Sequence, residues 1–134
     1  MRGRENKDAS KDRWERHDWW EVTLESPDPA RSLRFWSAVL DKPIHTESEE
    51  GGSIDFQEGV VGLSVQKAEV YEPPVWPPER GKQGMQMHLE IEVTDLAAAV
   101  EHAIELGATQ AEYQPQDNVR VMLDPDGHPF CLYT

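Results

Sequence analysis

One internal repeat constrains the fold of this chain more than any other feature of its sequence. The segment 87–107, MHLEIEVTDLAAAVEHAIELG, aligns with 20–40, WEVTLESPDPARSLRFWSAVL, at an offset of 67 residues. The match is one of pattern rather than identity, because alternating strand-like residues align with alternating residues and Asp95 aligns with Asp28. A twofold repeat within one chain predicts two similar modules and places any shared pocket between them.

The same offset continues through the later strands of each half. It aligns four apolar residues of the second half with four of the first: Val121 with Ile54, Leu123 with Phe56, Phe130 with Leu63, and Leu132 with Val65. Alternation and turn residues predict strands at 20–26, 44–47, 53–57 and 60–67 in the first half, and at 87–93, 109–113, 118–123 and 129–134 in the second.

A helix is expected after the first strand of each half. The first helix should cover 30–40, with Asp28 as its N-cap and Pro29 in its first turn. The second should follow the N-cap Asp95 and end at Gly107. The predicted fold class is therefore α+β, with two βαβββ modules paired around a shared cavity that strands 1 and 4 of each module line.

The ends of the modules follow from composition. Residues 1–18 contain eleven charged residues and lack the apolar stretch of a signal peptide, so we expect a charged, flexible N-terminal extension. Residues 69–84 contain four prolines and predict a stiff, extended linker. The chain is thus interpreted as one domain at 19–134, with modules at 19–68 and 85–134.

The net charge of −13 limits the partners of the protein. Residues 19–134 alone carry −14, which would repel a phosphate backbone and attract cationic ligands, so we expect no nucleic-acid partner. The acid could also serve only solubility. No apolar stretch approaches the ~20 residues of a membrane span. The single cysteine, Cys131, excludes an intramolecular disulfide and favours a cytoplasmic location.

Two stretches of the chain resemble the vicinal oxygen chelate superfamily, which includes glyoxalase I, extradiol dioxygenases and bleomycin-resistance proteins. MHLEIEVTDLAAAVEHAIELGAT followed by LDPDGHPFCLY is similar to the second module of that family, and PDPARSLRFWSAVLDKP to its first helix. The resemblance covers 19–134 and points to the small glyoxalase-like proteins. It implies the paired βαβββ fold and a divalent metal held between the modules by four side chains from strands 1 and 4.

Transferring those four positions to this chain gives Glu21, Ser64, His88 and Cys131. Only His88 keeps the family's residue type, and neither strand-4 position carries a carboxylate. Serine is a poor metal ligand, so we expect no complete metal centre. If a divalent metal (Zn, Ni, Fe or Mn) does bind, the resemblance implies Glu21, His88 and Cys131 as its ligands.

The resemblance also indicates which side chains would line the pocket. The expected ligand-binding residues are Glu21, Ser64, Gln66, His88, Cys131 and Tyr133. Each has an alternative interpretation: His88 could be structural, Cys131 a small buried apolar group, and Glu21 a solvated surface charge. Trp76 could stack on a ligand or pack the linker onto a module.

Several further residues are expected to have no role in chemistry. Asp124 and Asp126 are interpreted as turn residues, and His128 is expected to have no partner at metal-ligand spacing. The sequence identifies no catalytic residue.

These observations favour a protein that binds a small organic molecule, especially a cationic aromatic one, without a complete metal centre. The alternative is a metal-dependent lyase, isomerase or dioxygenase with His88 as a ligand. A third possibility is a dimerising or regulatory module. Because members of the resembled family often pair modules across two chains, we also predict a homodimer.

Overall fold

The computed structural model describes residues 20–56 and 61–134. The predicted extension at 1–18, and the predicted strand ends at Gln57 and Val60, lie outside these residues. The chain divides into two compact units, Met1–Ala68 and Glu69–Thr134, and each contains one module. In the part of the chain that is described, no helix is both long and apolar enough to cross a membrane.

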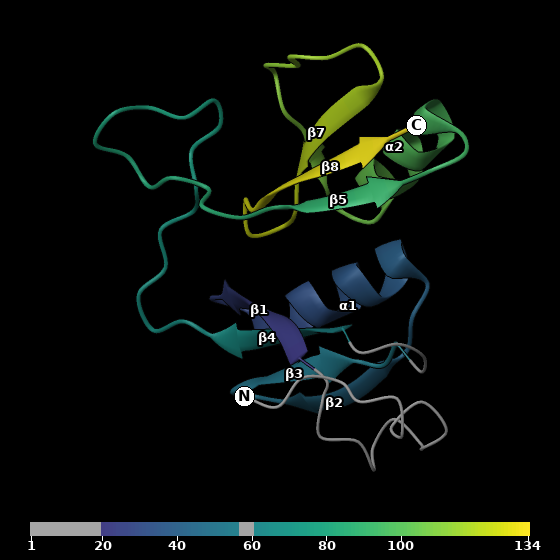
Figure 1. Ribbon diagram of the computed structural model, residues 1–134. Coiled ribbons are helices and arrows are strands. Elements are labelled where there is room, and N and C mark those ends of the chain that lie inside the picture. The colour runs from purple at the N-terminus through teal and green to yellow at the C-terminus, as the bar shows by residue number, and fades with distance from the viewer. Residues whose placement is uncertain (1–19, 57–60) are drawn as a thin grey trace, which may run out of the picture. The chain divides into compact units, whose positions relative to one another are not determined.

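The first module is a four-stranded sheet with one helix (Figure 1). Its elements are β1 (Trp20–Ser26), α1 (Pro29–Leu40), β2 (Ile44–Ser48), β3 (Gly51–Ile54) and β4 (Val61–Lys67). The strand order is β1-β4-β3-β2, with β1 parallel to β4 and the remaining pairs antiparallel. The fully buried side chains of Leu33 and Trp36 from α1 form a core with Ile54, Leu63 and Val65 of the sheet.

The second module repeats this arrangement. Its elements are β5 (Leu89–Glu92), α2 (Leu96–Glu105), β6 (Thr109–Gln110), β7 (Val119–Leu123) and β8 (Pro129–Tyr133), in the strand order β5-β8-β7-β6. Strand β5 is parallel to β8, and β7 is antiparallel to both of its neighbours. Phe130 and Met122 are its most buried apolar residues.

Both helices begin at the aspartates that the sequence analysis identified. The Asp28 carboxylate accepts a hydrogen bond from the Arg31 backbone N–H at 3.1 Å, and Asp95 accepts one from Ala98 N–H at the same distance. Pro29 occupies the first turn of α1, where a missing N–H costs nothing. The same local signal therefore starts the helix in each module.

Strand pairing confirms the 67-residue repeat. Val22 pairs with Leu63 in the first module, and Leu89 pairs with Phe130 in the second, so both residues of the pair are shifted by the same offset. The α+β fold class with two βαβββ modules is confirmed.

The predicted alignment of the third strands is wrong by one residue. A tight turn at Glu49–Glu50 brings Ser48 opposite Gly51, so β3 spans Gly51–Ile54 rather than 53–57. Leu63 then pairs with Ile54, whereas its equivalent Phe130 pairs with Met122. Met122, not Val121, is therefore the equivalent of Ile54. Because strand side chains alternate, this slip places Val121 on the opposite face.

Two strands are shorter than the sequence predicted. Strand β5 covers Leu89–Glu92 instead of 87–93, and β6 covers Thr109–Gln110 instead of 109–113. His88 therefore lies just before the paired part of β5. Apolar alternation extends beyond the residues that form a hydrogen-bonded ladder, so pattern alone overestimates strand length.

The proline-rich segment 69–84 contains no helix or strand and belongs to the second unit. The Val75 backbone N–H donates to the Gln83 carbonyl at 2.9 Å, which closes a loop. The Tyr71 hydroxyl donates to the Asp126 carbonyl at 2.8 Å, which holds the start of the segment on the second module.

Candidate functional site

Each sheet has one face packed against its helix and an opposite face, which we call the open face. In β1, Glu21, Thr23 and Glu25 lie on the open face and alternate with Val22 and Leu24. Their register partners in β4 are Gly62, Ser64 and Gln66. The three predicted residues of the first module, Glu21, Ser64 and Gln66, therefore share one face.

A row of hydroxyl groups crosses the open face of the first module. Thr23 Oγ1 and Ser64 Oγ are 2.9 Å apart, and Thr46 Oγ1 and Ser53 Oγ are also 2.9 Å apart. Ser53 and Ser64 are register partners on adjacent strands, so all four strands contribute one hydroxyl. Sequence reasoning missed Thr23, although its alternation with Glu21 was a usable signal.

The open face of the second module carries the other three predicted residues. His88, Glu90 and Glu92 follow each other along it, and Cys131 and Tyr133 are the register partners of Glu90 and Glu92. His88 Nε2 lies 3.4 Å from Glu90 Oε1. One ligand atom each of His88, Glu90 and Cys131 lies within 4.8 Å of the others.

Glu90 was not among the predicted site residues. The signal that could have found it is the sequence His-Leu-Glu, because strand alternation places residues 88 and 90 on the same side. Glu90 places a carboxylate next to Cys131. This carboxylate comes from the neighbouring strand β5, whereas the family's carboxylate stands at the strand-4 position.

The thiol of Cys131 is held in its neutral form. Burial raises its pKa, and the Glu90 carboxylate raises that pKa further because it repels a thiolate. A reactive cysteine nucleophile has the opposite shift, towards a low pKa. Without a cation nearby, Cys131 therefore behaves as a small buried group rather than as a nucleophile.

Trp76 covers part of this open face. It packs against the cluster of Ala111, Val121 and Cys131, and its Nε1–H donates to the Tyr113 carbonyl at 3.1 Å. The Trp76 and Tyr113 rings lie 6.2 Å apart between centroids. This arrangement favours the interpretation of Trp76 as a group that packs the proline-rich segment onto a module.

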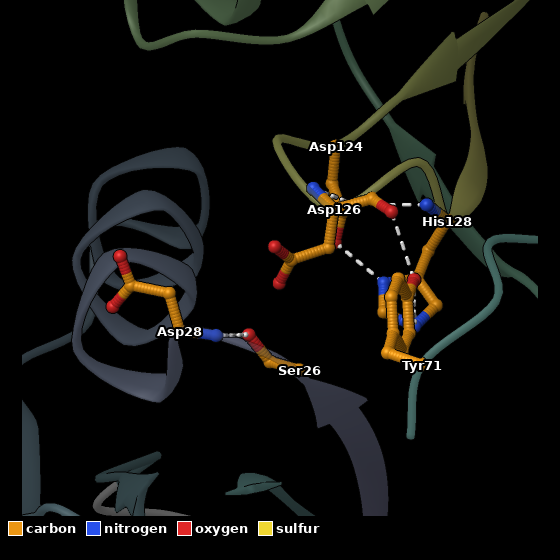
Figure 2. Close-up of polar contacts among 6 residues, drawn as sticks. All are labelled: Ser26, Asp28, Tyr71, Asp124, Asp126 and His128. Carbon is orange, nitrogen blue, oxygen red and sulfur yellow. Dashed lines mark hydrogen bonds and ion pairs between the residues drawn. The ribbon is translucent and has the colours of Figure 1, made fainter. Parts of the chain in front are cut away.

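A buried hydrogen-bond network joins the β7–β8 turn to the segment before Trp76 (Figure 2). Asp124 Oδ1 accepts from the backbone N–H groups of Asp126 and His128 at 2.9 and 2.8 Å. Asp124 Oδ2 lies 2.9 Å from His128 Nδ1, and His128 Nε2 lies 3.2 Å from the Tyr71 hydroxyl.

The prediction that His128 has no partner at ligand spacing is wrong, because Asp124, Asp126 and His128 form a close group. The hydrogen bonds already engage both Asp124 oxygens and both His128 nitrogens. The group therefore stabilises the turn, as the sequence suggested for its two aspartates.

A groove of about 420 Å³ lies on the helix side of the second module, away from the predicted site residues. Its lining residues come from α2, β6 and β7: Leu96, Ala97, Val100, Glu101, Gln110 and Arg120.

Most of the described strand carboxylates lie on the open faces; the exception is Glu47 of β2, which lies on the helix side, 3.5 Å from Arg34 of α1. Among the described strand residues, the charged groups on the open faces are all carboxylates: Glu21, Glu25, Glu90 and Glu92. Lys67 pairs with buried Ser26, and Arg120 pairs with buried Leu132, so both lie on the helix-covered faces. The open faces are therefore acidic, while the cationic strand residues point the other way.

The family's four-ligand metal centre does not fit the residues at its positions. Ser64, a poor ligand, pairs its hydroxyl with Thr23, and both strand-4 positions lack a carboxylate.

Comparison with known proteins identifies the fold and the family. The sequence profile of the glyoxalase-like domain matches residues 21–133. No curated protein sequence matches the chain.

Solved structures share the architecture at low sequence identity. A glyoxalase/bleomycin resistance protein/dioxygenase family enzyme from Burkholderia phytofirmans is 16% identical, with 84% of this chain and 94% of that chain covered and a TM-score of 0.61. The fosfomycin resistance protein FosX from Mesorhizobium loti is 16% identical, with coverages of 88% and 92% and a TM-score of 0.62.

A glyoxalase-related enzyme from Fulvimarina pelagi is 17% identical, with 87% of each chain covered and a TM-score of 0.62. These likenesses show the glyoxalase/bleomycin resistance fold. The profile match over most of the length confirms the glyoxalase-like resemblance seen in the sequence: the chain belongs to the glyoxalase-like domain family.

Proposed function

We propose that this protein binds a small, positively charged organic molecule on the open faces of its sheets, without a complete metal centre of the family type. The observation that carries the proposal is the division of charge. Four glutamates lie on the open-face positions of β1 and β5, and the cationic strand residues Lys67 and Arg120 lie on the opposite faces. Several carboxylates would attract a cation that binds on an open face.

The remaining groups on these faces suit an organic ligand. The hydroxyl row of the first module offers hydrogen-bond donors and acceptors. The second module offers the Tyr133 side chain and the Trp76 ring, which packs against the cluster of Ala111, Val121 and Cys131. Aromatic rings near carboxylates favour organic cations, because the ring face attracts positive charge and the ring body contacts apolar atoms.

Isosteric probes test the role of charge most directly. We expect an aryl trimethylammonium compound to bind at least tenfold more tightly than its tert-butyl isostere, because the two differ only in charge. Isothermal calorimetry at low and high salt measures both affinities. Equal binding of the two compounds would contradict the proposal.

Variants locate the binding on the open faces. The substitutions Glu21→Gln and Glu90→Gln should each weaken binding of the cation several-fold. The matched control is Glu101→Gln on α2, which removes the same charge from a residue that lines the helix-side groove. If the control weakens binding as much as the two test variants, the cation is attracted by overall charge and the proposal fails.

The metal-dependent alternative, with His88 as a ligand, has a separate test. Elemental analysis of the purified protein measures metal per chain. A stoichiometric metal ion that requires both Glu21 and His88 would favour that alternative over the proposal.

A further inference from the structure

Three side chains of different chemistry converge on the open face of the second module. His88 and Glu90 lie on one side of β5, and Cys131 of β8 is the register partner of Glu90. The imidazole Nε2 and the carboxylate Oε1 are 3.4 Å apart, and the thiol belongs to the same group within 4.8 Å. Glu90 and Cys131 come from adjacent parallel strands of one module, and His88 comes from the position just before β5, so a single module brings the three together.

The spacing of these atoms suits a zinc ion. Zinc binds nitrogen and oxygen at about 2.0–2.2 Å and sulfur at about 2.3 Å, so tetrahedral ligands lie roughly 3.3–3.8 Å from one another. The imidazole–carboxylate distance falls in this range. The side chains of His88 and Glu90 are 32% and 63% exposed, which leaves both free to adjust towards an ion.

The chemistry of the group selects zinc over harder ions. Magnesium and calcium prefer oxygen ligands, whereas a thiol with an imidazole and a carboxylate is a donor set that zinc accepts. A zinc ion would also remove the conflict between Cys131 and Glu90, because a dication stabilises a thiolate beside a carboxylate. The proton that the thiol gives up goes to solvent.

We propose that the second module binds one zinc ion through His88 Nε2, the Glu90 carboxylate and Cys131 Sγ. This site differs from the family's centre, because its carboxylate comes from β5 instead of a strand-4 position and because its ligands lie within one module. The site shares Glu90 with the face proposed above to attract an organic cation, but the zinc proposal does not rest on that function.

Zinc titration of the full-length, chelator-treated protein tests the site without any organic ligand. Competition with a chromogenic chelator should give one zinc per chain, with higher affinity at pH 8 than at pH 6 because the thiol must lose its proton. Cobalt(II) in place of zinc should give a thiolate-to-metal charge-transfer band. Absence of zinc binding, or cobalt binding without that band, would overturn the proposal.

Variants distinguish this site from the family's arrangement. His88→Ala, Glu90→Gln and Cys131→Ala should each lower zinc affinity at least tenfold. Two control variants should keep the zinc affinity within twofold of wild type. Glu92→Gln removes the next carboxylate along the same face, and Glu21→Gln removes the carboxylate at the family position. If Cys131→Ala does not fold, the other two variants still decide the matter. The proposal fails if Glu90→Gln binds zinc as wild type does, or if Glu21→Gln loses it.

Repeating the organic-cation titration in the presence of a strong chelator separates the two proposals. Cation binding without zinc binding leaves the proposed function intact and overturns the zinc site. Zinc binding without cation binding supports the zinc site and contradicts the proposed function.

Discussion

The open faces of the two modules have the same backbone and different chemistry. Thr23 beside Ser64 in the first module occupies the positions of Glu90 beside Cys131 in the second, with identical strand register. The first pair forms a neutral hydrogen bond at 2.9 Å. The second is a carboxylate against a buried thiol, partly covered by Trp76. Strand pairing and helix caps are thus kept across the repeat, while the exposed side of each sheet has diverged.

The largest expected difference between the modules concerns the tryptophans. Replacing Trp76 with alanine should lower the free energy of unfolding by about 2 kcal/mol, because a partly buried indole leaves the Ala111–Val121–Cys131 cluster. Trp20→Ala in the first module removes a side chain that is 53% exposed and should cost less than about 0.5 kcal/mol. Urea denaturation measures both, and equal losses would refute the packing role of Trp76.

A similar contrast holds for two aspartates. Asp124→Asn should lower stability by about 2 kcal/mol, because the buried carboxylate accepts two backbone N–H groups and contacts His128, and an amide cannot replace both oxygens. Asp28→Asn should change stability by less than about 0.5 kcal/mol, since asparagine caps a helix as well as aspartate. Thermal unfolding of both variants checks this, and a stable Asp124→Asn protein would contradict the network.

A smaller loss of stability is expected for substitutions at Thr23 and Glu90, which occupy equivalent positions in the two modules. Thr23→Val removes the hydroxyl that contacts buried Ser64 and should cost about 1 kcal/mol. Glu90→Gln, at the equivalent position, should be nearly neutral in metal-free protein because its side chain is 63% exposed. Chemical denaturation in the presence of a chelator is the measurement. A larger loss of stability in Glu90→Gln than in Thr23→Val would contradict this expectation.

The smallest expected effect on stability comes from the titration of the Cys131 thiol. The pKa of this thiol is raised in the folded state, so the folded protein binds the proton more tightly than the unfolded chain does. The stability that this shift contributes is fully present below the unfolded thiol's pKa of about 8.5. It declines as the pH rises from that value through the folded pKa. Alkylation by iodoacetamide in metal-free protein should therefore show a higher pH midpoint in the folded than in the unfolded chain. Glu90→Gln should lower that midpoint, and an unchanged midpoint would contradict the role of Glu90.

The sequence predicted the fold well because periodicity and caps are local. Asp28 and Asp95 act as expected, and the 67-residue offset holds for the parallel strand pairs. The one-residue slip at β3 could not be predicted, because it depends on the tight turn at Glu49–Glu50.

The site was predicted less completely. Ser64 and Gln66 in the first module, and His88, Cys131 and Tyr133 in the second, lie on the open faces, but their neighbours Thr23 and Glu90 were missed. The reason is physical: the family positions mark one residue per strand, whereas the chemistry depends on register partners across strands. The segment 69–84 showed in the sequence only as proline-rich, and its contacts through Trp76 and Tyr71 needed the tertiary structure.

The proposed function requires that the open faces, rather than the acidic surface as a whole, bind a small organic cation. Amide NMR spectra of the full-length, metal-free protein, titrated with an aryl trimethylammonium compound, test it most directly. We expect saturable shifts concentrated at open-face strand residues such as Thr23, Ser64, Glu90 and Cys131, with little change along α2. Shifts that follow the exposed acids of α2, or that scatter over the surface without saturation, would contradict it.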